Sequence, residues 1–185
     1  MMSAAHRLSR SDTVAVLVDV QVRLIEAMWN AAATVRRAAV LMQGCRALGV
    51  PILWTEQMPA KLGPTVPELS AALAGATAIS KSAFSCPSEP AFASALSALG
   101  RRTVLLAGIE THVCVYQTAL DLVALGMDVR IATDAVASRS PDDRAAALQA
   151  MAAAGASIVT VEMALFDLLG TADDPAFRTI LRLVK

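Results

Sequence analysis

The chain has 185 residues and balances 16 Lys and Arg against 16 Asp and Glu. This length suffices for one domain with a sizeable core, and no apolar run approaches the ~18 residues that a membrane-spanning helix needs. The basic residues are scattered and form no stripe that could follow a phosphate backbone. We therefore expect a cytoplasmic protein that binds neither membranes nor nucleic acid.

The three cysteines, Cys45, Cys86 and Cys114, lie far apart and form no CxxC pair. This spacing indicates neither a disulfide framework nor a thiolate zinc site, and it suits a reducing compartment. The start of the chain lacks the apolar stretch of a secretory signal. We expect residues 1–12 to be a disordered tail and residues 13–185 to form a single domain.

Strand patterns and helix patterns alternate along the chain. The β-branched run TVAVLVDV, residues 13–20, predicts a parallel strand that is buried on both faces. Further strands are predicted over 51–56, 76–81, 102–108, 128–133 and 157–161, with helices over 34–50, 89–99, 111–125 and 140–155. This alternation favours a three-layer α/β/α sandwich around a six-stranded, mainly parallel, Rossmann-like doubly wound sheet.

Three reactive side chains are predicted at the carboxyl ends of strands, where open parallel sheets bind their ligands. Asp19 closes the first strand, Lys81 closes the third, and Cys114 lies in the first turn of the helix after the fourth. A helix N-terminus and a nearby ammonium would lower the pKa of a thiol. A carboxylate could accept the thiol proton and later activate water. Each residue alone is also an ordinary turn, surface or core residue, but together they predict a cysteine hydrolase that needs no metal or cofactor.

The segments LVDVQ, KSAFS and GIETHVCVYQTALDLVALGMDVRIATDAVASR resemble the isochorismatase-like cysteine hydrolases, which include nicotinamidases and N-carbamoyl amidases. The resemblance covers nearly the whole chain, and WTEQMPAKLGPTVPEL is similar to the subgroup of isochorismatase domain-containing proteins. It implies that Asp19 is the general base, Lys81 the cationic stabiliser and Cys114 the nucleophile of a thioester intermediate. It also implies a cis peptide between Ile109 and Glu110, which would aim the backbone N–H groups of Glu110 and Cys114 at one oxyanion.

Two departures from the family patterns narrow the expected chemistry. Metal-dependent nicotinamidases carry an Asp-x-His pair near the end of the second strand, where this chain has Thr55, Glu56 and Gln57. We therefore expect no catalytic metal and not nicotinamide as the substrate. Isochorismatase itself cleaves a vinyl ether without a cysteine at the position of Cys114, so the thiol favours a small amide or a related C–N substrate. The alternatives are a metal-free vinyl ether hydrolase and a non-catalytic binding or oligomerisation protein.

Contacts to the small-molecule substrate are expected from polar and aromatic residues near the strand ends, although aromatic residues there are often part of the core. The expected contacts are Gln21, Glu56, Gln57, Phe84, His112 and Tyr116, and Trp54 is expected to line the same pocket.

The C-terminal stretch DPAFRTILRLVK places Phe177, Ile180, Leu181 and Leu183 in an amphipathic pattern. We expect some apolar surface of this kind to pair with another subunit in a homo-oligomer.

Overall fold

The computed structural model describes residues 7–75 and 77–185. Six strands form one sheet in the order β3-β2-β1-β4-β5-β6, and every adjacent pair is parallel. The predicted six-stranded α/β sandwich is therefore confirmed, and the sheet is parallel throughout. The strands are β1 (Thr13–Val18), β2 (Ile52–Gln57), β3 (Ile79–Lys81), β4 (Thr103–Ile109), β5 (Asp128–Ala137) and β6 (Ser157–Val159).

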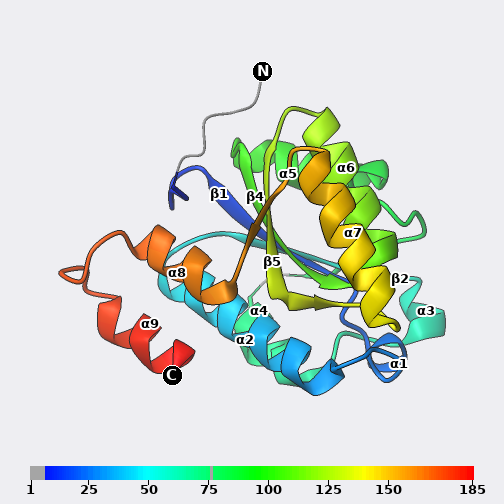
Figure 1. Ribbon diagram of the computed structural model, residues 1–185, viewed down its shortest axis with the longest axis horizontal. Helices are drawn as coiled ribbons and strands as arrows, with labels where there is room; N and C mark the ends of the chain where they lie inside the picture. Colours follow the sequence, from blue (N-terminus) through cyan, green and yellow to red (C-terminus); the bar gives the residue numbers. More distant parts are fainter. Residues whose placement is uncertain (1–6, 76) are drawn as a thin grey trace.

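Helices cover both faces of this sheet (Figure 1). One face packs against α2 (Ala31–Ala47), α4 (Ser70–Leu73), α8 (Val161–Leu169) and α9 (Phe177–Val184). The other face packs against α5 (Pro90–Leu99), α6 (Tyr116–Ala124) and α7 (Pro141–Ala153). Short turns complete the chain: α1 (Val22–Ile25), α3 (Pro59–Leu62), the 3-10 turns η1 (Pro67–Leu69) and η2 (Cys86–Ser88), and the π-helical turn η3 (Thr111–Val115).

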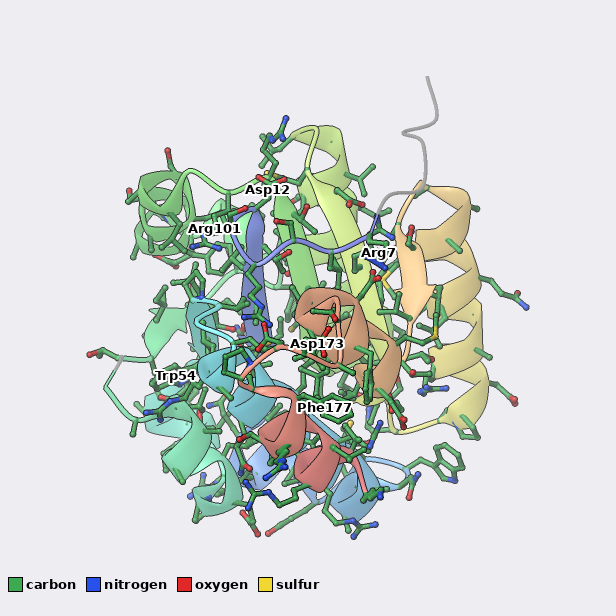
Figure 2. All side chains as sticks on the ribbon, turned by 90° about the vertical axis from the view of Figure 1, so that its left-hand side faces the viewer. Arg7, Asp12, Trp54, Arg101, Asp173 and Phe177 are labelled. Atoms are coloured by element: carbon green, nitrogen blue, oxygen red, sulfur yellow. The ribbon has the colours of Figure 1, made fainter. Side chains whose placement is uncertain are left out.

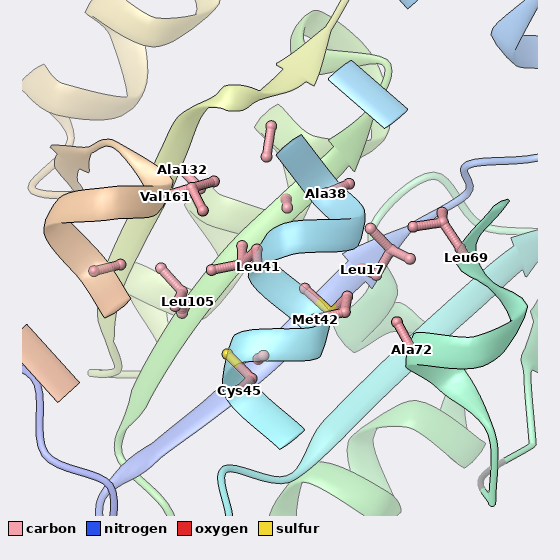
Figure 3. Packing of buried hydrophobic residues seen from close by; sticks show 14 of the residues in the cluster. Leu17, Ala38, Leu41, Met42, Cys45, Leu69, Ala72, Leu105, Ala132 and Val161 are labelled. Carbon is pink, nitrogen blue, oxygen red and sulfur yellow. The ribbon is translucent and has the colours of Figure 1, made fainter. Parts of the chain in front are cut away.

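The apolar layer beneath α2 shows how the sandwich is held together (Figure 3). Leu41 and Met42 of α2 are fully buried against Leu17 of β1 and Leu105 of β4. Burial of each such side chain contributes roughly 2 kcal/mol. β1 lies between β2 and β4 and is buried along its whole length. Asp19, which directly follows β1, is therefore placed near the middle of the carboxyl edge of the sheet.

The structure differs from the predicted elements at several boundaries. β5 continues to Ala137 because its register against β4 shifts between Leu106 and Gly108, which extends the strand past the predicted end. The last strand stops at Val159, and Thr160 caps an additional helix, α8, by accepting a hydrogen bond from the Met163 N–H. Part of the predicted third strand, residue 76, lies outside the described residues.

The predicted tail over residues 1–12 lies partly outside the described residues, at 1–6, and the remainder is packed against the C-terminal part of the chain (Figure 2). Leu8 is buried, and its N–H donates to Asp167. Arg10 donates to the Leu168 carbonyl at the end of α8 and forms a 2.6 Å ion pair with Asp174. Residues 7–12 are therefore packed and not disordered as expected. One physical reason is that Arg10 binds carbonyls that the end of helix α8 leaves free.

The amphipathic C-terminal helix α9 packs within its own chain. Ile180 is fully buried, and Phe177 and Leu183 are partly buried against the same apolar layer that α2 covers. Part of this apolar stripe is therefore used inside the chain, and its expected pairing with another subunit stays a prediction. Among the described residues, no helix is long and apolar enough to cross a membrane.

Candidate active site

Three chain segments bring Asp19, Lys81 and Cys114 together at the carboxyl edge of the sheet. Asp19 follows β1 and has a φ of 51°, which turns the chain at the strand end. Its N–H donates to the Thr55 carbonyl at 3.2 Å, so β2 fixes its position. Lys81 ends β3 and pairs in register with Gln57 of β2, whereas Cys114 lies in η3, directly after β4.

A buried ion pair forms the centre of this cluster. Lys81 Nζ lies 2.7 Å from Asp19 Oδ2, and neither side chain is exposed. Lys81 Nζ also donates to Gln57 Oε1 at 2.6 Å and to the carbonyls of Ala83 and Phe84 at 3.1 Å each. Since these partners use all the protons of the ammonium, Lys81 acts on the site through its charge.

The Cys114 thiol lies close enough to this ion pair for the charges of both Asp19 and Lys81 to act on its pKa. Its burial, followed by the negative charge of Asp19, raises the pKa of Cys114 to about 12, and the positive charge of Lys81 opposes this only in part. The expectation of a lowered thiol pKa is therefore corrected. Lys81 is already neutralised by Asp19, and desolvation favours the uncharged thiol. The raised pKa keeps the Cys114 thiol protonated at neutral pH.

Hydrogen bonds hold the π-helical turn η3, which contains Cys114, in place. The peptide bond between Ile109 and Glu110 is cis, and the Glu110 carbonyl accepts hydrogen bonds from the N–H groups of Val113 and Val115. His112 Nδ1 lies 2.9 Å from Ser138 Oγ, just beyond the end of β5. The predicted helix over 111–125 is thus a π-helical turn followed by α6, and Cys114 lies in the π-helical part.

Three of the expected substrate contacts are occupied by contacts within the protein. Gln21 accepts from the Gln57 N–H through Oε1 and donates to the Gly63 carbonyl through Nε2, both at 2.7 Å. Glu56 Oε1 accepts from the N–H and the hydroxyl of Thr65. Gln57 bonds Lys81 through Oε1 and the Ser82 carbonyl through Nε2. The three side chains therefore hold strands and loops in place, and their contact with a substrate stays a prediction.

The aromatic and ionisable candidates are divided between the two faces of the sheet. Phe84 is 52% exposed beside Lys81, and Tyr116 is partly buried against the apolar cluster that contains Cys114. The Glu110 carboxylate accepts a 2.9 Å hydrogen bond from Arg139. Trp54 packs on the opposite face, beneath α2, and lines a cavity of about 510 Å³ away from the cluster. Its expected place in the active-site pocket is corrected, because neighbouring residues of a strand point to opposite faces.

Sequence reasoning missed two residues in contact with the cluster. The Thr55 hydroxyl donates to Asp19 Oδ1 at 2.7 Å, and Cys86 Sγ lies 3.8 Å from the same hydroxyl. Burial raises the pKa of Cys86 to about 11. Thr55 and Gln57 are two residues apart on a predicted strand, so the sequence did indicate that their side chains point to the same face of the sheet. Nothing in the sequence indicated Cys86. Across residues 7–75 and 77–185, no group of three His, Cys, Asp or Glu side chains could hold a metal ion.

A parallel α/β sheet with a carboxylate, an ammonium and a thiol at its carboxyl edge has the architecture of a Rossmann-like hydrolase. The model of the isochorismatase domain matches residues 13–163. Isochorismatase domain-containing protein 2 from Danio rerio is 39% identical over 183 residues, which cover 99% of this chain and 92% of that protein. The chain belongs to the isochorismatase family.

Solved structures agree with this assignment. The MAR1 ribonuclease from Caenorhabditis elegans has a TM-score of 0.91 and 34% identity, and the match covers 97% of this chain and 92% of that one. The YcaC gene product from Escherichia coli, an octameric hydrolase of unknown specificity, has a TM-score of 0.92 and 26% identity. That match covers 98% of this chain and 92% of the other. One of these proteins is called a ribonuclease and the other a hydrolase of unknown specificity, so the substrate of this chain has to be argued from the site.

Proposed function

We propose that this chain is a cysteine hydrolase that cleaves a small amide or a related C–N substrate through a thioester acyl-enzyme. The observation that carries this proposal is the buried Asp19–Lys81 pair, 2.7 Å apart, close enough to the buried Cys114 thiol for both charges to act on it. A buried ion pair is costly to form and contributes little net stability. Its closeness to a nucleophilic side chain supports a chemical role.

In the acylation step, the proton of Cys114 passes to Asp19 while Sγ bonds to the substrate carbonyl carbon. The carbonyl π electrons move to oxygen, and the backbone N–H groups of Glu110 and Cys114 are proposed to bind the resulting oxyanion. When the oxyanion collapses, the C–N bond breaks, and the proton on Asp19 passes to the leaving amine. The thioester on Cys114 and the ionised Asp19 remain.

In the deacylation step, Asp19 accepts a proton from water as the water oxygen bonds to the thioester carbon. Collapse of this second intermediate breaks the C–S bond, releases a carboxylic acid and returns the proton to Cys114. Lys81 lies 2.7 Å from Asp19 Oδ2 and supplies a fixed positive charge beside the base in both half-reactions. The cycle therefore uses one base twice and needs no further proton carrier.

The test is a comparison of Cys114→Ala with Cys45→Ala, because Cys45 is a buried thiol on α2 outside the cluster. Both are assayed on primary amides, N-carbamoyl compounds, a vinyl ether and a short single-stranded RNA. We expect hydrolysis of a C–N substrate that falls at least about a thousandfold in Cys114→Ala and persists in Cys45→Ala. Intact-mass analysis should detect the acyl group on Cys114.

Other outcomes of the same assay identify the alternatives. Vinyl ether turnover that survives Cys114→Ala would establish a metal-free hydrolase of the isochorismatase type. Binding without turnover of any compound would favour a non-catalytic member of the fold, and cleavage of RNA alone would replace the amidase proposal.

We also propose that the protein forms a homo-oligomer, since the Escherichia coli relative is an octamer. Light scattering on the purified chain checks this, and a monomer over the whole accessible concentration range would refute it.

A further inference from the structure

The end of strand β2 contacts both charged members of the cluster. Thr55 pairs in register with Val18 of β1, next to Asp19, and Gln57 pairs in register with Lys81 of β3. Residues two apart on a strand point to the same face of the sheet. One strand end can therefore reach Asp19 on one side and Lys81 on the other.

Thr55 holds Asp19 through two separate bonds. Its carbonyl accepts from the Asp19 N–H at 3.2 Å, and its hydroxyl donates to Oδ1 at 2.7 Å. Lys81 lies 2.7 Å from the other carboxylate oxygen, Oδ2. With both oxygens engaged, the plane of the buried carboxylate is fixed relative to the Cys114 thiol.

Gln57 holds Lys81 in a comparable way. Its Oε1 accepts from Nζ at 2.6 Å, and its Nε2 donates to the Ser82 carbonyl at 2.8 Å. Only this orientation of the amide satisfies both partners, since an ammonium donates and a carbonyl accepts. The Gln57 backbone is itself clamped by Gln21, which bonds both its N–H and its carbonyl.

We infer that Thr55 and Gln57 are a pair of positioning residues that hold the Asp19 carboxylate and the Lys81 ammonium in the geometry that proton transfer from Cys114 requires. The inference rests on the proposed function, because it concerns the same three reactive groups. Neither side chain has to touch a substrate. Thr55 acts through Asp19, and Gln57 acts through Lys81.

The test is the rate at which iodoacetamide alkylates Cys114 at neutral pH, followed by peptide mass spectrometry. Thr55→Val removes the hydroxyl at nearly constant volume and should slow alkylation about tenfold, the effect of one hydrogen bond to a charged group. Thr55→Ser should restore the rate to within about twofold, because it keeps that bond. Thr13→Val is the matched control, since Thr13 is a buried strand threonine whose hydroxyl has no hydrogen-bond partner among the described residues.

A double-mutant cycle separates positioning from general packing. In an Asp19→Asn background, Thr55→Val should cause no further slowing, because residues that act through one another are not additive. For the second residue, Gln57→Leu should slow alkylation about tenfold, and this effect should vanish in a Lys81→Met background. Gln43→Leu on α2 is its matched control, and melting temperatures establish that every variant is folded.

The outcomes distinguish this inference from the proposed function. If Cys114→Ala hydrolyses the C–N substrate as fast as the wild type, the proposed function fails. If wild-type Cys114 is reactive but Thr55→Val and Gln57→Leu match it, only the positioning inference fails. Equal slowing by Thr55→Ser and Thr55→Val would also overturn it, since the hydroxyl would then be irrelevant.

Discussion

Two ion pairs at opposite ends of the parallel sheet differ in how far they are exposed to water. At the carboxyl end, the side chains of Lys81 and Asp19 are fully buried and 2.7 Å apart. At the amino end, Asp12 and Arg102 are 3.4 Å apart, and the Arg102 side chain is 84% exposed. Figure 2 shows Asp12 near Arg101 at the start of β1. An exposed pair can separate into water at little cost, whereas a buried pair must stay intact. The buried end therefore holds a fixed arrangement of charge, which is what a reaction site needs.

The largest expected effect comes from breaking the buried pair. Lys81→Met leaves the Asp19 carboxylate without its cation and should lower the free energy of unfolding by about 4 kcal/mol. Urea unfolding followed by circular dichroism measures this. Arg102→Met at the other end of the sheet is the control and should leave the midpoint nearly unchanged. Similar losses in both variants would show that burial does not separate the two ends.

A smaller effect is expected from the backbone contact beside the site. Gly108 has a φ of 126°, and a Cβ at this position would lie 2.1 Å from the Val18 carbonyl oxygen. Gly108→Ala should therefore cost roughly 3 kcal/mol, from the strained φ and the overlap together.

The control for this substitution precedes the same strand at its amino end. Gly100 has a φ of 60° and open space around the position of a Cβ, so Gly100→Ala should cost only about 1 kcal/mol. Thermal unfolding of both variants compares them. A Gly108→Ala protein as stable as Gly100→Ala would mean that β1 and β4 separate easily near the site.

The buried thiols predict a loss of stability in alkali. Burial raises the pKa of Cys45 from 9.0 to about 12, so the folded protein keeps a proton that the unfolded chain releases. Stability is full below pH 9 and falls as the pH rises toward 12, by up to about 1.4 kcal/mol per pH unit for each such thiol. Urea midpoints across this range measure the slope. Cys45→Ala should make the slope shallower, and an unchanged slope would exclude Cys45 as a contributor.

The smallest effect is expected where the N-terminal segment meets α8 and α9. Arg10 and Asp174 form a 2.6 Å ion pair with side chains 33% and 17% exposed. Arg10→Gln should cost about 1 kcal/mol or less, and high salt should reduce the difference from wild type. Unfolding at low and high salt checks this. If Arg10→Gln lowered the free energy of unfolding as much as Lys81→Met, Arg10 would contribute to stability as strongly as a buried charge.

Sequence patterns predicted the strands of the sheet well, but they did not predict the contacts around Asp19, Lys81 and Cys114. The continuous apolar run of β1 and the regular alternation with helices indicated a parallel sandwich, because strand and helix periods are local properties. The additional helix α8 and the longer β5 were missed. The first begins at a cap made by Thr160, and the second depends on a register shift against β4.

The candidate site was predicted as a set of residues, while their environment was not. Asp19, Lys81 and Cys114 were each expected at a strand end or just beyond one, because the carboxyl ends of parallel strands share one edge of the sheet. Gln21, Glu56 and Gln57 were expected to contact substrate, and the sequence did not indicate that each also bonds another part of the chain. The amino-acid sequence alone does not show which hydrogen bonds the folded chain makes.

The sequence by itself indicated the family, the alternation of strands and helices, and the three residues of the candidate site, because motif spacing and periodicity are local properties of the chain. Only the tertiary structure decided that the Cys114 thiol holds its proton, with a pKa raised to about 12, and that Thr55 and Gln57 face Asp19 and Lys81. The reason is physical. Desolvation and hydrogen bonding depend on every neighbour in space, and β1, β2 and β3 meet only when the sheet forms.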